Sequence, residues 1–145
     1  MSRVSLSDEL STLRLIREKN RKNHSRSNSV AVVMASRRPD DLGDSLTFLR
    51  GQTLPTFELH LGLHGFNLNT SLKNEITKLR NRKIKVFVHY FDETKTLGEI
   101  LTALAQGTTS RYISKMDDDD FYSSEHLHDL LDCIIVHGCE VRSEE

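Results

Sequence analysis

The sequence predicts an α/β domain with a mostly parallel sheet and helices on both of its faces. Two observations lead to this prediction. Strand-like apolar segments alternate with helical ones from residue 30 to residue 138, and such alternation is typical of layered folds whose parallel strands are joined by crossover helices. The opening strand, Val30 to Ala35, is apolar throughout and rich in valine, as expected of a strand that is covered on both faces.

Each predicted strand is followed by a helical pattern. The strands cover residues 30–35, 57–64, 84–90 and 111–116. The second strand alternates apolar with polar residues, which predicts one less apolar face. Pro39 suits the entrance of the first helix, and Gly51, Gly107 and Gly138 are expected to end the first, third and fourth helices. The four helical stripes consist of Leu42, Leu46 and Leu49; Leu72, Ile76 and Leu79; Leu97, Ile100, Leu101 and Leu104; and Leu127, Leu130, Leu131, Ile134 and Ile135.

Residues 1–28 are predicted to form an N-terminal helix and a polar linker ahead of the domain, which we place at residues 29–145. A thin leucine stripe marks the helix over residues 5–22, and the stretch after it is polar and rich in helix breakers. The first 38 residues are strongly basic. We prefer a solvated basic helix and linker, although such a surface also attracts nucleic acid, anionic lipid or a phosphate-bearing ligand.

Composition limits the class of protein. The chain has 145 residues, of which 37% are hydrophobic, and this suffices for one domain with a core. No apolar run approaches the roughly 20 residues that span a bilayer, and the start lacks the apolar stretch of a secretory signal. Cys133 and Cys139 are too few for a disulfide framework. We therefore expect a cytoplasmic protein with no transmembrane segment. The net charge of −1 gives no reason to expect nucleic acid as a partner.

Four consecutive carboxylates, Asp117 to Asp120, directly follow the fourth predicted strand. Crowded like charges are unfavourable unless a cation neutralises them, and carboxylate oxygens suit hard divalent cations such as Mg²⁺ or Mn²⁺. A cation at the carboxyl end of a strand is well placed to hold a diphosphate, because ligands of open α/β sheets bind at that edge. The alternatives are a solvated acidic run, or N-caps for a helix that begins at Ser123 or Ser124.

Other phosphate and metal sites of α/β proteins place their residues elsewhere. The first strand is followed by Ser36-Arg37-Arg38-Pro39 rather than by a glycine-rich phosphate loop. The ends of the first and third strands do not match a phosphoacceptor domain or an aspartate-nucleophile phosphatase. A nuclease-like metal site needs an upstream glutamate after a strand, and no convincing candidate is present. An Asp-x-Asp-Asp motif at the end of the fourth strand is what remains.

The order of these motifs has a precedent. The opening strand leads into Arg38-Pro39, and the helix end at residues 46–53 contains Gln52. Gly98 lies in the third helix and Gly107 follows it. Residues 112–122 surround the acidic run. From about Ser29 to His137 this order resembles the nucleotide-sugar-binding half of a family 2 glycosyltransferase. The resemblance implies a GT-A fold, which is a Rossmann-like α/β arrangement.

The resemblance also implies roles for single residues. Asp117 and Asp119 would hold Mn²⁺ or Mg²⁺ against the diphosphate of the donor. Asp120 would lie beside them, near the donor sugar, as a catalytic or supporting residue. Asp118 is expected to be a spacer that faces solvent. The residues expected to border the nucleotide follow the first two strands and are Ala35, Ser36, Arg37, Arg38 and His64.

The activity that the resemblance implies is metal-assisted transfer of a sugar from a nucleotide-sugar donor to an unknown glycan or lipid-linked acceptor. His64 stands where the family usually has an acidic residue, and no residue is an evident general base, which must reach the acceptor hydroxyl. The family's acceptor half lies well beyond the acidic motif, so we expect a short or truncated form. The alternative is a non-catalytic remnant or nucleotide-sugar-binding module.

Overall fold

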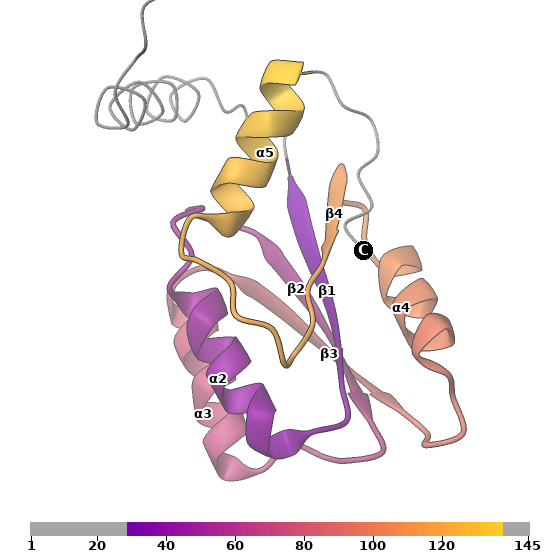
Figure 1. Cartoon of the computed structure of the whole chain (residues 1–145). Coiled ribbons are helices and arrows are strands. Elements are labelled where there is room, and N and C mark those ends of the chain that lie inside the picture. Colours follow the sequence, from indigo (N-terminus) through magenta and orange to yellow (C-terminus); the bar gives the residue numbers. More distant parts are fainter. Residues whose placement is uncertain (1–28, 138–145) are drawn as a thin grey trace, which may run out of the picture.

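A computed structural model of the chain describes residues 29–137 and shows a four-stranded sheet between helices (Figure 1). The strands are β1 (Val30–Ser36), β2 (Glu58–His64), β3 (Lys85–Phe91) and β4 (Tyr112–Lys115). The helices are α2 (Pro39–Arg50), α3 (Thr70–Asn81), α4 (Leu97–Gln106) and α5 (His126–His137). The predicted α/β class is confirmed. The helix predicted for residues 5–22, the linker and Gly138 lie outside the described residues.

The strand order is β3-β2-β1-β4, and every strand pair is parallel. The chain builds outward from β1 through β2 to β3, and then returns to place β4 on the other side of β1. The direction of winding therefore reverses between β1 and β4. Open α/β sheets bind ligands outside the carboxyl ends of the strands at such a reversal, so the topology singles out the ends of β1 and β4.

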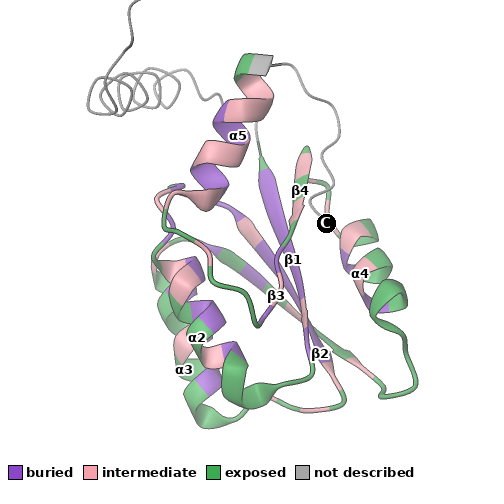
Figure 2. Ribbon diagram, viewed as in Figure 1, coloured by how far each residue is buried: buried purple, intermediate pink, exposed green. Residues whose placement is uncertain are grey.

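The larger core lies on one face of the sheet, under α2, α3 and α5. Alternate residues of β1, including Val32 and Met34, are buried there together with the leucines of β2. The predicted stripes of α2 and α3 face this core, and Leu127 and Leu131 of α5 join it. Figure 2 shows the result as buried residues along β1 and on the inner sides of the helices. The stripe positions follow from the helical period of 3.6 residues.

The other face of the sheet is covered by α4 alone among the described helices. Ile100 and Leu104 of α4 pack with Val33 of β1 in a second, smaller core. Gly62 of β2 lies directly beneath them and has no side chain in the way. The absence of a Cβ at this position lets α4 approach the sheet closely.

Gly62→Ala is expected to lower the free energy of unfolding by about 1–3 kcal/mol, which is typical of overpacking in a core. The new Cβ would lie 2.8 Å from Cγ2 of Ile100 and 3.2 Å from Cδ1 of Leu104. Urea unfolding measures the effect. Gly43→Ala is the matched control, because a Cβ there is 4.0 Å from its nearest neighbour, Leu72. Equal stability of the Gly62 variant and the native chain would show that α4 does not need this close approach.

The less apolar face predicted for β2 carries Glu58, His60, Gly62 and His64. This face is also covered in part, because His60 is only 3% exposed and its ring stacks on that of Phe87 at 4.7 Å. One sequence prediction differs from the structure in detail. Helix α5 begins at His126 rather than at Ser123 or Ser124. A distant side chain sets this start, since Gln52 Oε1 accepts from the Leu127 N–H at 3.1 Å and Gln52 Nε2 donates to the Ser123 carbonyl at 2.7 Å.

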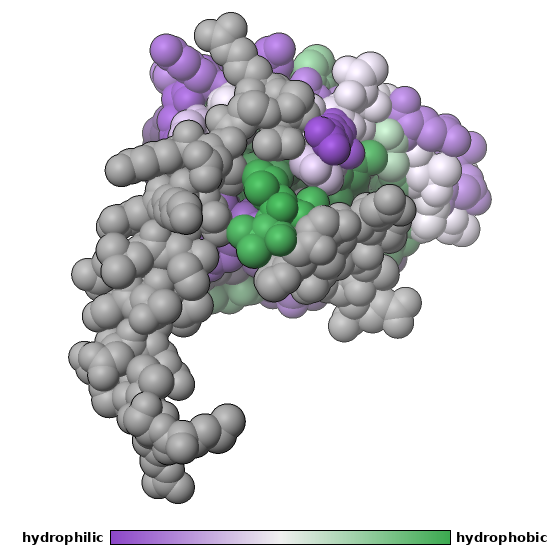
Figure 3. Space-filling model, turned by 90° about the horizontal axis from the view of Figure 1, so that it is seen from above, coloured by the Kyte–Doolittle hydropathy of each residue, from purple (hydrophilic) through white to green (hydrophobic). Residues whose placement is uncertain are grey.

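The end of the molecule where the strands begin has an apolar surface. Figure 3 looks onto this end and shows hydrophobic side chains gathered there. Val136, near the C-terminal end of α5, is 52% exposed. This surface lies at the opposite end of the sheet from the carboxyl ends of β1 and β4. None of the helices within residues 29–137 combines the length and the apolar character needed to cross a bilayer.

Candidate functional site

The candidate site lies where β1 and β4 end side by side. Residues 116–122, which we call the acidic loop, leave the end of β4 and turn over the end of β1. The Met116 N–H donates to the Val33 carbonyl at 3.1 Å, so the ladder between β4 and β1 continues one residue into the loop. Asp117 to Asp120 therefore arrive beside Ser36 and the start of α2, at the reversal point of the sheet.

Asp118 is buried, and this corrects the expectation that it faces solvent. It is 8% exposed. Its carboxylate Oδ2 accepts from Ser36 Oγ at 2.6 Å, and its main-chain carbonyl accepts from Ser45 Oγ, also at 2.6 Å. The sequence could not show this, because Ser36 belongs to β1 and Ser45 to α2. The second residue of the acidic run is thus held by two hydroxyls from two other elements.

Asp117 and Asp119, the predicted metal ligands, remain partly exposed on either side of Asp118. Lys115 Nζ lies 3.5 Å from Asp117 Oδ1, and Arg38 Nη2 lies 3.3 Å from Asp119 Oδ2. Arg38 also reaches Asp41, in the first turn of α2, with 3.8 Å between Nη1 and Oδ2. The crowded carboxylates are therefore neutralised in part by cationic side chains from the ends of β4 and β1.

Tyr122 closes the acidic loop, a role that sequence reasoning missed. The Asp117 N–H donates to the Tyr122 hydroxyl at 2.9 Å, and this hydroxyl donates to Asp120 Oδ2 at 3.5 Å. Burial raises the pKa of Tyr122, and the negative charges of Asp117 and Asp120 add to the rise. The hydroxyl therefore stays protonated at neutral pH and remains a donor toward Asp120.

A pocket of about 210 Å³ opens between α2 and the acidic loop. Its acidic side consists of Asp41 and Asp44 on α2 together with Asp118, Asp119 and Asp120 of the acidic loop, whereas Asp117 does not line it. Phe48 and Phe121 form its aromatic side, with their rings edge to face at 4.8 Å between centroids. Ligand pockets usually begin at roughly 300 Å³, so this one has room for a cation or part of a ligand rather than for a whole nucleotide sugar.

The donor chemistry of the loop fits Mg²⁺ or Mn²⁺, but the described residues form no complete cage. Within residues 29–137 no group of three His, Cys, Asp or Glu side chains is arranged around a common metal position. Such a cage is not required, because Mg²⁺ typically binds through one or two carboxylates together with waters and substrate phosphates. Asp117 and Asp119 each offer one carboxylate, and in this structure these carboxylates are paired with Lys115 and Arg38.

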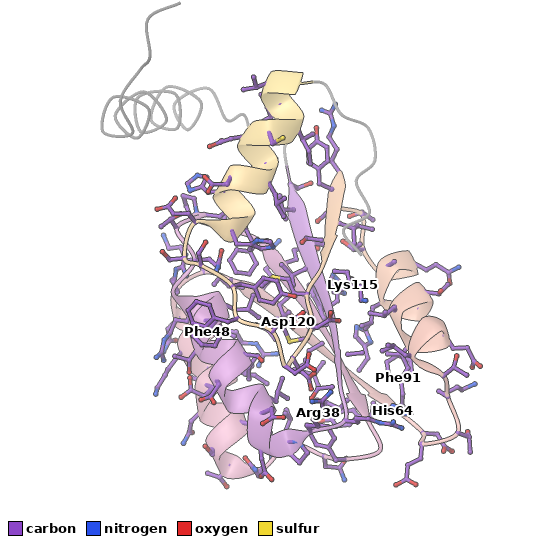
Figure 4. The ribbon with its side chains drawn as sticks, viewed as in Figure 1. Arg38, Phe48, His64, Phe91, Lys115 and Asp120 are labelled. Carbon is purple, nitrogen blue, oxygen red and sulfur yellow. The ribbon has the colours of Figure 1, made fainter. Side chains whose placement is uncertain are left out.

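The structure brings some of the predicted nucleotide-bordering residues to the acidic loop and places others on the far face of the sheet. Ser36 and Arg38 contact the loop directly. Ala35 packs with the α4 core, and His64 Nε2 lies 3.2 Å from the Glu93 carbonyl. Figure 4 shows Arg38 and His64 at the edge where β1 and β2 end, and Asp120 beside α2. Arg37 is exposed in the loop between β1 and α2.

Two further residues, Ser45 and Gln52, shape the site. No pattern in the sequence singled out Ser45, whereas Gln52 was part of the family resemblance. Ser45 is a polar residue within the helical stripe of α2, and its hydrogen bond to the Asp118 carbonyl shows that it faces the acidic loop. Gln52 belongs to the helix end at residues 46–53, which carries part of that resemblance. Its amide bonds hold the start of α5, and the residues just before that helix lead out of the acidic loop. No local pattern indicates either contact.

Comparison with known proteins finds no match by sequence but several matches by structure. No family model and no curated protein sequence matches the chain. Among solved structures, residues 1–349 of TarS from S. aureus, a glycosyltransferase, match with a TM-score of 0.63 and 18% identity. The chain has a glycosyltransferase-like fold. A longer TarS structure matches with a TM-score of 0.62 and 19% identity, and a complex of residues 1–349 with UDP with 0.61 and 18%.

The shared region is most of this chain but a minor part of TarS. The match covers 76% of the chain in all three comparisons. It covers 33% of the two shorter TarS structures and 20% of the longer one. At this level of identity the likeness concerns the fold of the α/β region.

Proposed function

We propose that this chain is the donor-binding part of a glycosyltransferase of the family 2 type, and that it binds a nucleotide sugar with Mn²⁺ or Mg²⁺. One observation carries the proposal. The acidic loop leaves β4 at the reversal point of the parallel sheet, beside the basic Ser36–Pro39 loop that leaves β1. This is the edge at which open α/β sheets bind their ligands, and it combines cation-binding oxygens with guanidinium groups that suit phosphate.

Each part of the site has a proposed role. Asp117 and Asp119 would hold the cation, which when bound stabilises the charge that develops on the leaving diphosphate. Arg38, or its neighbour Arg37, would contact the phosphates, because a guanidinium offers paired donors that match phosphate oxygens. Asp120 would lie next to the donor sugar. The TarS complex with UDP makes UDP sugars the first donors to test.

A second candidate is a nucleotide-sugar-binding module that performs no transfer. It is considered because no residue of the sequence is an evident general base for an acceptor hydroxyl. Both candidates require the same donor site. They are separated by incubating the purified chain with a UDP sugar and Mn²⁺ and following release of UDP. Sustained turnover supports a transferase or hydrolase, and stoichiometric binding without turnover supports the module.

Mn²⁺-dependent binding of a UDP sugar is the expected result of the primary test, isothermal titration calorimetry with and without Mn²⁺. Asp119→Asn is expected to weaken Mn²⁺ binding at least about tenfold, because the loss of one charged ligand removes more than 1.4 kcal/mol of interaction. Asp117→Asn is expected to act in the same direction.

Glu99→Gln is the matched control for these variants. It also removes one carboxylate, but from α4 on the opposite face of the sheet, where Glu99 is 55% exposed beside Lys95. Its Mn²⁺ and nucleotide affinities should equal those of the native chain. If no common sugar nucleotide binds the native chain in the presence of Mn²⁺, the proposed function is wrong.

A further inference from the structure

Asp118 joins the two halves of the candidate site. Its carboxylate lies 2.6 Å from Ser36 Oγ, a length typical of a hydroxyl that donates to an ionised carboxylate. Ser36 Oγ also accepts from the Arg38 N–H at 3.2 Å. One buried hydroxyl therefore contacts both the acidic loop and the loop that carries the arginines. The carboxylate and the hydroxyl are 82 residues apart in the sequence and meet across the reversal point between β1 and β4.

The main chain of the same residue is held separately. Ser45 Oγ donates to the Asp118 carbonyl at 2.6 Å. Ser45 and Ser36 are 5% and 2% exposed, so water has little access to either bond. The side chain and the carbonyl of Asp118 are thus each held by a buried hydroxyl from another element. Its neighbours Asp117 and Asp119 keep their side chains 43% and 47% exposed.

We propose that Asp118 is a positioning residue. It fixes the acidic loop so that Asp117 and Asp119 face the cation, and it fixes the basic Ser36–Pro39 loop so that its arginines face the diphosphate. This inference rests on the proposed function. Groups that orient metal ligands without touching the metal commonly change metal affinity about 10- to 100-fold when they are removed. Asp118 acts in this way through the hydroxyls of Ser36 and Ser45. It borders the pocket, but it is only 8% exposed and its Oδ2 accepts from Ser36, so we assign it the holding of the loop rather than of the cation.

Charge-neutral variants test the proposal. Ser36→Ala removes the side-chain bond and Ser45→Ala removes the main-chain bond, and each leaves every carboxylate of the acidic loop in place. Mn²⁺ affinity is measured without nucleotide from the electron paramagnetic resonance signal of free Mn²⁺, well below the melting temperature. Both variants are expected to bind Mn²⁺ about tenfold more weakly or worse than the native chain. Thr47→Ala is the control, because its hydroxyl belongs to the same helix but donates to the Gly43 carbonyl.

The possible outcomes separate this inference from the proposed function. If the native chain binds Mn²⁺ and both serine variants bind it equally well, Asp118 has only a structural role and the inference is overturned. If the native chain binds Mn²⁺ only together with a UDP sugar, the serine variants are compared in the presence of that sugar nucleotide. If it binds Mn²⁺ neither alone nor with a UDP sugar, the proposed function fails and the inference fails with it. Circular dichroism confirms that each variant is folded, and if Ser36→Ala does not fold, Ser45→Ala decides the question alone.

Discussion

Replacing Arg38 with methionine is expected to strengthen Mn²⁺ binding and weaken nucleotide-sugar binding in the same protein. Arg38 pairs with Asp119 at 3.3 Å and with Asp41 at 3.8 Å, and its side chain is 51% exposed. Half-exposed ion pairs are worth at most about 1 kcal/mol, so release of Asp119 should raise Mn²⁺ affinity about two- to fivefold. Loss of a charge-assisted bond to phosphate removes about 1.5–3 kcal/mol, so nucleotide affinity should fall at least about tenfold.

The prediction is specific because the Arg38 variant should gain Mn²⁺ affinity while it loses nucleotide-sugar affinity. Mn²⁺ binding is measured by electron paramagnetic resonance without nucleotide, and UDP-sugar binding by calorimetry at saturating Mn²⁺. Arg37→Met is the matched control, because Arg37 is an exposed neighbour that makes no ion pair with the acidic loop in the described part of the chain. A variant at position 38 that lost affinity for both ligands would show that Arg38 does not compete with the cation. A loss of nucleotide affinity at position 37 instead would assign the phosphate contact to Arg37.

Arg82→Met is expected to lower the free energy of unfolding by about 3 kcal/mol. The substitution removes a charged donor, so several backbone carbonyls lose their hydrogen bonds at once. The Arg82 guanidinium donates to the carbonyls of Leu49, Arg50, Gln52 and Leu54. The first two carbonyls belong to the last turn of α2, where the backbone lacks helical partners. Burial lowers the pKa of Arg82 from its usual value, and arginine in proteins remains charged.

Urea unfolding of Arg82→Met measures this loss. Arg80→Met is the control, since Arg80 is exposed and donates to a single carbonyl, that of Val86 at 2.9 Å. The control should cost about 1 kcal/mol or less. The Arg82 variant should also loosen the site, because Gln52, whose carbonyl Arg82 holds, caps the start of α5. Equal stability of the two variants would show that water replaces Arg82 without loss.

Most helices and strands of this fold could be predicted from the residue pattern along the chain. The valine-rich run of β1 predicted burial on both faces, and the leucine stripes of α2 and α3 predicted the helix faces that enter the core. The ends of elements were less predictable. Helix α5 begins at His126 because Gln52, some 75 residues away, bonds the Leu127 N–H. A local search for Ser or Asp caps cannot find a partner at that distance.

The candidate site was predictable in position but not in arrangement. Carboxylates after a strand placed the acidic run at one edge of the sheet, because parallel strands end at a common edge. That β4 lies next to β1, rather than beyond β3, is known only from the pairing of Val30 with Tyr112 and of Val33 with Lys115. This pairing brings Arg38 to Asp119 and thus unites the basic and acidic loops.

Asp118 marks the boundary between what the residue order reveals and what folding adds. Hydrophobic period, glycine and proline positions and the run of four aspartates are properties of neighbouring residues, so the α/β class and the acidic loop follow from the sequence alone. Which aspartate turns inward depends on hydroxyls 73 and 82 residues away, on α2 and β1. A buried carboxylate is stable only where such partners converge, and their convergence requires the assembled sheet.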